Sequence, residues 1–115
     1  MEEQRYPIPT ARRYIVQAFM HLNKVHKTNF ALLELGYIDY HGGKFIQANM
    51  YDKDRKEKFA VLVNELIFKG HDCKFTVLDT EAKASPNLTD RDLIILRIAR
   101  LIWRAWKANF KEKSQ

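Results

Sequence analysis

The stretch from Thr89 to Lys113 constrains the fold more than any other part of this chain of 115 residues. It is the longest and most apolar periodic run, and at 100° per residue its basic side chains fall on one narrow arc. Those basic residues are Arg97, Arg100, Arg104, Lys107 and Lys111. Because most of the remaining circumference is apolar, the run predicts a long apolar C-terminal helix. We expect it to be covered on most sides by its own domain, by a second subunit or by both.

The first third of the chain predicts a short arm followed by one helix. Pro7 and Pro9 disfavour a helix over residues 1–9, which are expected to form a flexible N-terminal arm. Thr10 is a suitable N-cap, and apolar residues then recur at helical spacing over 11–25. A single domain is expected over residues 10–113.

A β-hairpin is predicted next. Apolar residues alternate over 32–40, the pair Gly42-Gly43 can supply both positive φ angles of a type I′ turn, and a second strand follows over 44–51. If His41 lies opposite Lys44, Leu33 shares a mostly apolar face with Leu35, Tyr37, Ile46, Ala48 and Met50. The opposite, outer face then carries Tyr40, Phe45 and Tyr51.

The rest of the chain predicts a helix, a strand and the C-terminal helix. A capping box of Asp54 and Glu57, apolar residues at helical spacing and a stop at Gly70 favour a helix over 55–69. Alternation over 73–79 favours a third strand, and Thr89 with Asp92 forms a capping box for the final helix. The expected fold is α+β, with a small, mainly antiparallel three-stranded sheet and three helices in the order α-β-β-α-β-α.

No pattern in the sequence indicates catalysis, a metal or a cofactor. The neighbouring His71 and Cys73 have no second ligand cluster at metal-binding spacing, and His21 and His26 lie five residues apart, so they do not share a helix face as an i, i+4 metal pair would. Motifs for phosphate, dinucleotide or nucleophile chemistry are absent from the sequence. A protein that is not an enzyme, with neither metal nor cofactor, is therefore expected.

Charge and aromatic residues favour a binding function. The formal net charge is +6, which favours polyanionic partners. We predict a small basic protein that binds DNA or RNA through the C-terminal helix, the N-terminal helix and the outer hairpin face. The predicted contact residues are Arg97, Arg100, Arg104, Lys107, Lys111, Arg12, Arg13, Tyr40, Phe45 and Tyr51. An interaction module for an acidic protein partner, such as an inhibitor, adaptor or chaperone, is the alternative, and attachment to anionic membrane a weaker one.

A narrow sheet offers little cover for so apolar a final helix, so a homodimer is also predicted. Its interface is expected to include Trp103, Trp106 and Phe110. No stretch is apolar for long enough to be a transmembrane segment. The single cysteine and the absence of a secretory signal pattern predict a cytoplasmic location.

Overall fold

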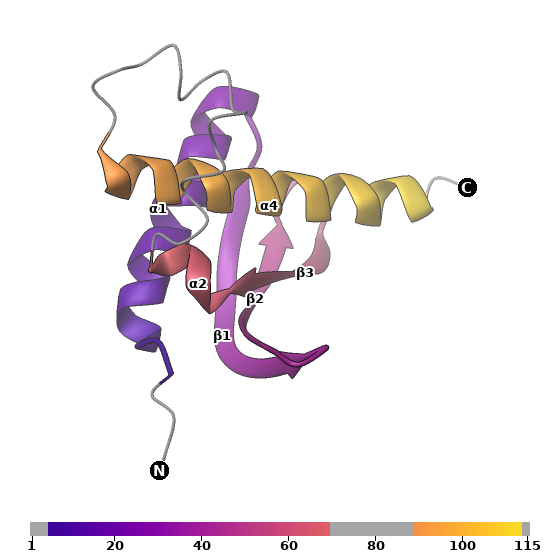
Figure 1. Cartoon of the computed structure of the whole chain (residues 1–115). Helices are drawn as coiled ribbons and strands as arrows, with labels where there is room; N and C mark the ends of the chain where they lie inside the picture. The colour runs from indigo at the N-terminus through magenta and orange to yellow at the C-terminus, as the bar shows by residue number, and fades with distance from the viewer. Residues whose placement is uncertain (1–4, 70–88, 114–115) are drawn as a thin grey trace.

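The chain folds into a three-stranded antiparallel sheet with helices before and after it. The computed structural model describes residues 5–69 and 89–113, with side chains up to residue 109. In chain order the elements are α1 (Ile8–His26), β1 (Phe30–Tyr40), β2 (Gly43–Asp52), β3 (Glu57–Asn64), α2 (Glu65–Phe68) and α4 (Asp90–Lys113) (Figure 1). This arrangement confirms the α+β class and the small antiparallel sheet. The order of the elements differs from the predicted one, because all three described strands precede α2.

Helix α1 begins earlier than its sequence suggests. Pro7 is the N-cap and Pro9 lies in the first turn, where a proline costs no intrahelical hydrogen bond. The helix ends at His26, and the C-cap residue Lys27 has a left-handed φ of 58°. The Asn23 side chain then fixes the turn into β1, since it accepts a hydrogen bond from the Phe30 backbone N–H at 2.9 Å and donates one to the Phe30 carbonyl at 3.1 Å.

The hairpin of β1 and β2 has the predicted strands but a different turn. His41 and Gly42 hold the two positive φ angles, 50° and 77°, so the turn lies one residue earlier than Gly42-Gly43. Tyr40 therefore lies opposite Gly43, and Leu35 lies opposite Ala48 rather than Met50. This is a shift of two residues, which changes the partners but keeps the side chains between the turn and Glu34 on their expected faces.

A β-bulge in β1 corrects one further assignment. The pairing changes register between Leu32 and Glu34, so Leu33 is the extra residue and its side chain is 48% exposed. Leu32 pairs with Met50 in its place. Leu33 does not join the apolar face that the regular alternation predicted.

The predicted helix over 55–69 is wrong, since most of this segment is strand β3. Phe59, Val61 and Val63 are buried, and the residues between them are more exposed, which is the period of a strand. The segment also carries apolar residues at helical spacing, and so short a run cannot be assigned by periodicity alone. Helical structure is limited to the four residues of α2, which Asn64 caps by accepting from the Leu66 backbone N–H at 2.9 Å. The strand predicted over 73–79 lies outside the described residues.

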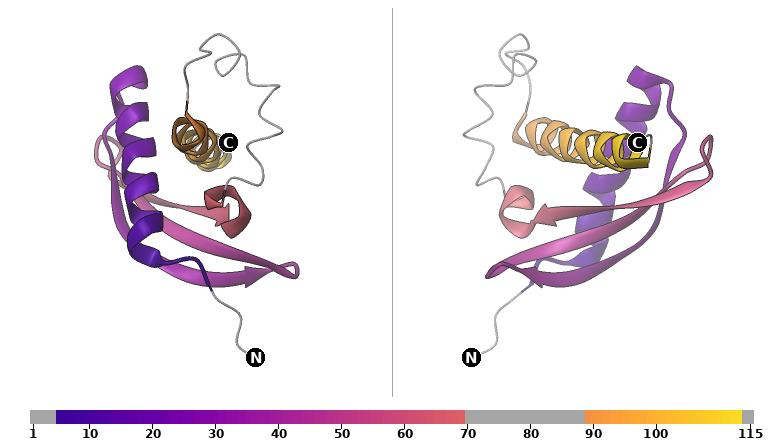
Figure 2. Two further views of the ribbon diagram at one scale, coloured as in Figure 1. Left: turned by 60° about the vertical axis from the view of Figure 1, so that its left-hand side comes forward. Right: turned by 90° about the vertical axis from the view of Figure 1, so that its right-hand side faces the viewer.

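Helices α1 and α4 lie on the same side of the curved sheet (Figure 2). Alternate residues of β2 and β3 face them and form the centre of the core with one face of each helix. The buried core side chains include Ile46, Met50, Val61, Val63, Ile15, Leu22, Ile98 and Ile102. Within the described residues no helix covers the other face of the sheet.

Helix α4 begins with the capping box that the sequence predicted. The Thr89 Oγ1 accepts from the Asp92 backbone N–H at 3.1 Å, and the Thr89 N–H donates to the Asp92 carboxylate at 3.1 Å. Ile94, Ile98, Ala99 and Ile102 are buried, whereas Arg100, Arg104 and Lys107 are exposed. One side of the helix is thus covered within the chain, by α1 and β3.

Residues just before α1 are held against the end of the sheet near the β1–β2 turn. The buried Glu65 carboxylate accepts hydrogen bonds from the Arg5 Nε at 2.6 Å and from the Tyr6 backbone N–H at 2.8 Å. The hydrogen bond to Glu65 raises the pKa of Arg5. The Tyr6 ring stacks on Phe68 with centroids 4.9 Å apart. Residues 1–4 of the predicted arm lie outside the described residues.

Candidate functional site

Three basic side chains follow one another along the exposed side of α4. Arg100, Arg104 and Lys107 are all exposed, and Arg97 is half-buried. With a rise of 1.5 Å per residue, Arg100 and Arg104 lie about 6 Å apart along the helix axis, and Lys107 lies about 4.5 Å further on. The side chain of Lys111 lies outside the described part of the chain. Most of the predicted basic stripe is therefore presented to solvent.

The turn between β2 and β3 brings a second group of basic residues to α4. Lys53, Arg55 and Lys56 are exposed in this turn. Lys56 closes it with a left-handed φ of 58° and donates its backbone N–H to the Asp52 carbonyl at 2.7 Å. The Arg55 guanidinium lies 5.5 Å from the centre of the Trp106 ring, which places the turn directly against α4.

A row of three aromatic rings joins α1, α4 and this turn. His26 stacks on Trp103 with ring centroids 4.0 Å apart, and Trp103 stacks on Trp106 at 5.0 Å. At the far end of this aromatic row, Trp106 donates its Nε1–H to the Asp52 carboxylate at 2.7 Å. The aromatic row thus links the end of α1, α4 and the end of β2.

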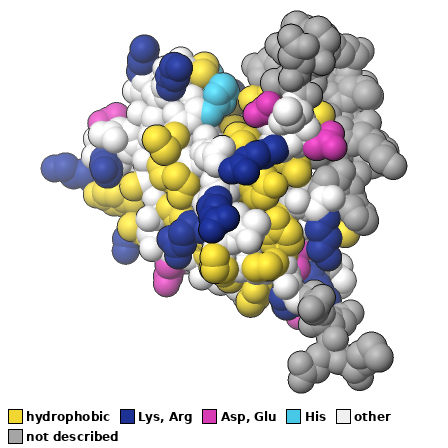
Figure 3. All heavy atoms as spheres, turned by 90° about the vertical axis from the view of Figure 1, so that its left-hand side faces the viewer, with side chains coloured by type: hydrophobic (Ala, Val, Ile, Leu, Met, Phe, Trp, Pro, Cys, Tyr) yellow, Lys and Arg dark blue, Asp and Glu magenta, His cyan; other side chains and the backbone are white. Residues whose placement is uncertain are grey.

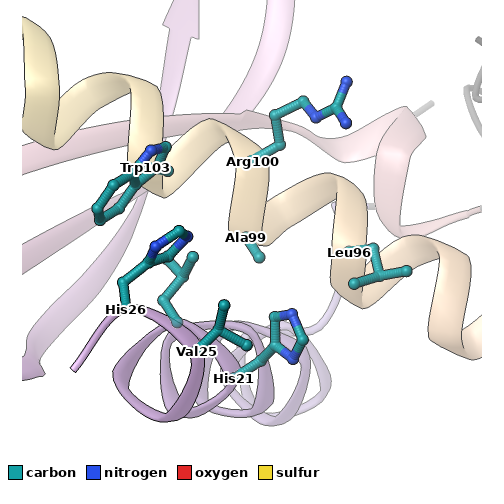
Figure 4. Close-up of a pocket in the computed structure, with 8 residues that line it drawn as sticks. His21, Val25, His26, Leu96, Ala99, Arg100 and Trp103 are labelled. Atoms are coloured by element: carbon teal, nitrogen blue, oxygen red, sulfur yellow. The ribbon is translucent and has the colours of Figure 1, made fainter. Parts of the chain in front are cut away.

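Next to the aromatic row, α1 and α4 enclose a groove of about 220 Å³. Figure 4 shows His21, Val25 and His26 rising from α1 toward α4, with Ala99 and Leu96 facing them. Trp103 and His26 form one end of this α1–α4 groove, and Arg100 borders it with its guanidinium pointing away from the groove (Figure 4). The groove therefore combines an apolar floor with two imidazole groups.

The predicted outer hairpin face exists but does not join the basic stripe. Tyr40 and Phe45 lie near the turn with their rings 6.0 Å apart, whereas Tyr51 lies at the other end of β2, opposite Ala31. All three alternate with β2 and β1 residues that face the helices, so they point to the side of the sheet away from α4. The structure thus separates the aromatic hairpin face from Arg100, Arg104 and Lys107.

Arg12 and Arg13 are also placed away from the aromatic row. Both are exposed on the outer side of α1, near its beginning, and Arg13 lies about 20 Å along the helix axis from His26. On the face shown in Figure 3, Lys and Arg side chains lie among hydrophobic ones. The exposed hydrophobic residues of α1 include Met20 and Val25. The two arginines form a separate basic site rather than an extension of the α4 stripe.

The residues predicted for a dimer interface have partners within the chain. Trp106 packs against Phe30 with centroids 5.7 Å apart in addition to its contacts with Asp52 and Trp103. Trp103 and Trp106 are both half-buried, and the side chain of Phe110 lies outside the described residues. The homodimer stays a prediction, and these intramolecular contacts account for much of the burial of both tryptophans.

The next question is whether the described ranges hold a group of metal ligands. No cluster of three or more His, Cys, Asp or Glu side chains that could hold a metal occurs within residues 5–69 and 89–109. His71 and Cys73 lie outside the described residues. No helix in the described part of the chain is both long and apolar enough to cross a membrane.

Sequence reasoning missed His26 and the basic turn as parts of the site. The stacking of His26 on Trp103 joins residues far apart in sequence, and no local pattern signals it. The turn had a signal, because a run of charged residues from 52 to 58 separates two apolar segments. Recognition of β3 as a strand would have identified this run as a basic hairpin turn.

A scan against protein-family models finds no match, and searches of curated proteins and of solved structures also find none. The function is therefore argued from the site.

Proposed function

We propose that this protein binds nucleic acid, without catalysis, through a basic surface formed by α4 and the β2–β3 turn. This basic surface consists of Arg100, Arg104, Lys107, Lys53, Arg55 and Lys56. The observation that carries the proposal is the Arg55–Trp106 contact, which brings the basic residues of the turn against the helix that carries the exposed basic residues of α4.

The positive charge of the basic surface favours a polyanionic ligand. Side chains spaced at about 4.5 to 6 Å along a helix axis can each meet a different phosphate of one strand. The Asp52 carboxylate is buried and accepts hydrogen bonds from Trp106 and from the turn backbone, so it compensates the basic surface only weakly. Asp54, between Lys53 and Arg55, is exposed and offsets part of the charge of the turn. The formal net charge of +6 acts in the same direction over longer distances.

The alternative is that an acidic protein partner uses the same basic surface. The two proposals differ in their dependence on salt and on ligand identity. Nucleic-acid binding releases counterions, so the logarithm of the affinity falls steeply and linearly with the logarithm of salt concentration. This dependence should be similar for many nucleic-acid sequences. Tight binding to one acidic protein with weak binding to every nucleic acid would favour the alternative. The single cysteine of the chain supports a reducing, cytoplasmic setting for either partner.

The test is a titration of fluorescent single-stranded and duplex DNA and RNA at several salt concentrations. Replacing Arg100→Gln and Arg104→Gln together should reduce the salt slope for a single strand by about 1.4, since each phosphate contact contributes about 0.7. Arg12→Gln with Arg13→Gln is the matched control, because it removes the same charge at the separate site on α1. We expect the control pair to change the slope by less than half as much.

Two results would contradict the proposal. One is equal weakening by both arginine pairs, which would mean that net charge alone determines binding. The other is an affinity for DNA and RNA that stays millimolar or weaker even at low salt. Circular dichroism of each variant verifies that loss of binding does not come from loss of structure.

A further inference from the structure

The α1–α4 groove lies directly beside Arg100, the first residue of the basic surface. Its residues come from two turns at the end of α1 and from two turns of α4, and Val25 at its rim is 54% exposed. A groove between two packed helices usually closes when large side chains from both meet. Here Ala99 stands where a larger residue would fill the space, so the groove stays open (Figure 4).

The size of the groove suits one planar ring system. A volume of about 220 Å³ corresponds to roughly seven water molecules, which is smaller than most pockets for drug-sized ligands. A stacked base pair of a duplex is too large and too constrained to enter. A single base turned away from its strand is of suitable size, because only its ring system needs to be accommodated.

The lining of the groove also suits a nucleobase. Apolar side chains of Leu22, Val25 and Leu96 can contact the faces of a base, and the exposed His26 ring offers a stacking partner at one end. His21 and His26 supply ring nitrogens that can donate or accept hydrogen bonds at base edges. The guanidinium of Arg100 points away from the groove, so it can meet a phosphate of a neighbouring nucleotide in the same strand.

We propose that the α1–α4 groove receives one unpaired base, so that the protein selects single-stranded nucleic acid over duplex. This inference rests on the proposed function, because the basic surface supplies the phosphate contacts next to the base. The groove adds contacts that only an unstacked base can make. Base–aromatic stacking of this kind is sequence-tolerant, since every base has a ring face.

The experiment compares the affinity for a single-stranded oligonucleotide with the affinity for a hairpin duplex of the same length and salt. Val25→Met extends a flexible side chain across the groove without changing charge. Val16→Met is the matched control, since Val16 lies on the same helix and does not line the groove. The expected result is a preference for the single strand of tenfold or more, which Val25→Met reduces to about threefold or less and Val16→Met leaves unchanged.

A second measurement tests the location of the base. Binding of a single strand to His26→Ala should be weakened about tenfold, whereas duplex binding should change less than twofold. Equal affinities of the wild-type protein for single strand and duplex would overturn the inference, and so would a single-strand affinity unaffected by both Val25→Met and His26→Ala in folded proteins. Either result can occur while the arginine pairs still behave as proposed, so failure of the groove is distinguishable from failure of the basic surface.

Discussion

The contact between α4 and the β2–β3 turn depends on one side chain, Asp52. Its carboxylate is 3% exposed and accepts three hydrogen bonds: from the Trp106 Nε1–H at 2.7 Å and from the backbone N–H groups of Asp54 at 3.0 Å and Arg55 at 3.2 Å. Hydrogen bonds to a charged group contribute about 1.5 to 3 kcal/mol when buried, and those in an exposed turn contribute less because water replaces them. The Arg55–Asp52 ion pair at 3.9 Å adds little, since Arg55 is substantially exposed and the interaction is screened.

These contributions give a loss of about 3 kcal/mol for Asp52→Ala, of which the bond to Trp106 accounts for the larger part. For a urea dependence of about 1.5 kcal/mol/M, the unfolding midpoint should fall by about 2 M. The assay is equilibrium unfolding in urea followed by circular dichroism. Asp54→Ala is the control in the same turn, because its carboxylate is exposed and makes one long contact of 3.4 Å to Asn29. It should cost less than about 0.5 kcal/mol.

A double-mutant cycle isolates the bond between Asp52 and Trp106. Trp106→Phe keeps an aromatic ring against Phe30 and removes the N–H donor. If the hydrogen bond stabilises the fold as argued, the two substitutions should show a coupling of about 1 to 2 kcal/mol. The reasoning is refuted if Asp52→Ala costs less than about 1 kcal/mol, or if the two substitutions are additive.

Two further predictions concern the hairpin turn and the start of α4. Gly42→Val should destabilise the fold by about 1 kcal/mol or more in urea unfolding, because φ at this residue is 77° and a β-branched residue resists that region; an unchanged midpoint would mean that the turn adopts another conformation. At α4, hydrogen bonds from the Thr89 backbone N–H and side chain lower the pKa of Asp92. A lowered folded-state pKa contributes stability that is present above about pH 4 and is lost as the pH falls through that lowered value. The stability difference between the wild type and Asp92→Asn should therefore shrink between about pH 5 and pH 2, whereas Asp90→Asn, which replaces the neighbouring exposed carboxylate, should show a smaller dependence; equal pH dependence in both variants would contradict the capping argument.

Much of the hairpin could be predicted from local pattern, because alternation and a glycine turn are local signals. The turn itself was misplaced by one residue, since His41 adopts the left-handed region that the sequence suggested for Gly43. Gly43 lies in β2, where a larger residue is disfavoured for a steric reason. A Cβ there would lie 2.9 Å from the Phe45 ring. A histidine with positive φ is uncommon, and nothing in the neighbouring residues signals it.

The assignment of β3 failed for a more general reason. Phe59, Leu62, Val63 and Leu66 fit a helix period, while Phe59, Val61 and Val63 fit a strand period, and β2 decides between them by offering an unpaired edge. Pairing between strands is a non-local interaction that local propensity does not contain. The same limit applies to the candidate site. Helical spacing predicted the exposed basic residues of α4, but the contact between α4 and the β2–β3 turn is visible only in the folded structure.

Helix α4 packs on the inner face of the sheet but follows the sheet in the chain, so this part of the core is uncovered until α4 has been synthesised. Ile46, Met50 and Val61 are translated before α4, and the bond between Asp52 and Trp106 spans a sequence separation of 54 residues. At about 5 to 20 residues per second, synthesis from the end of β3 to the middle of α4 takes roughly 2 to 8 seconds. Until α4 has been made, the apolar face of the sheet can be covered by α1 but not by α4. Cellular factors that shield apolar nascent segments would act on this chain in that interval, before the ribosome supplies the helix that completes the core.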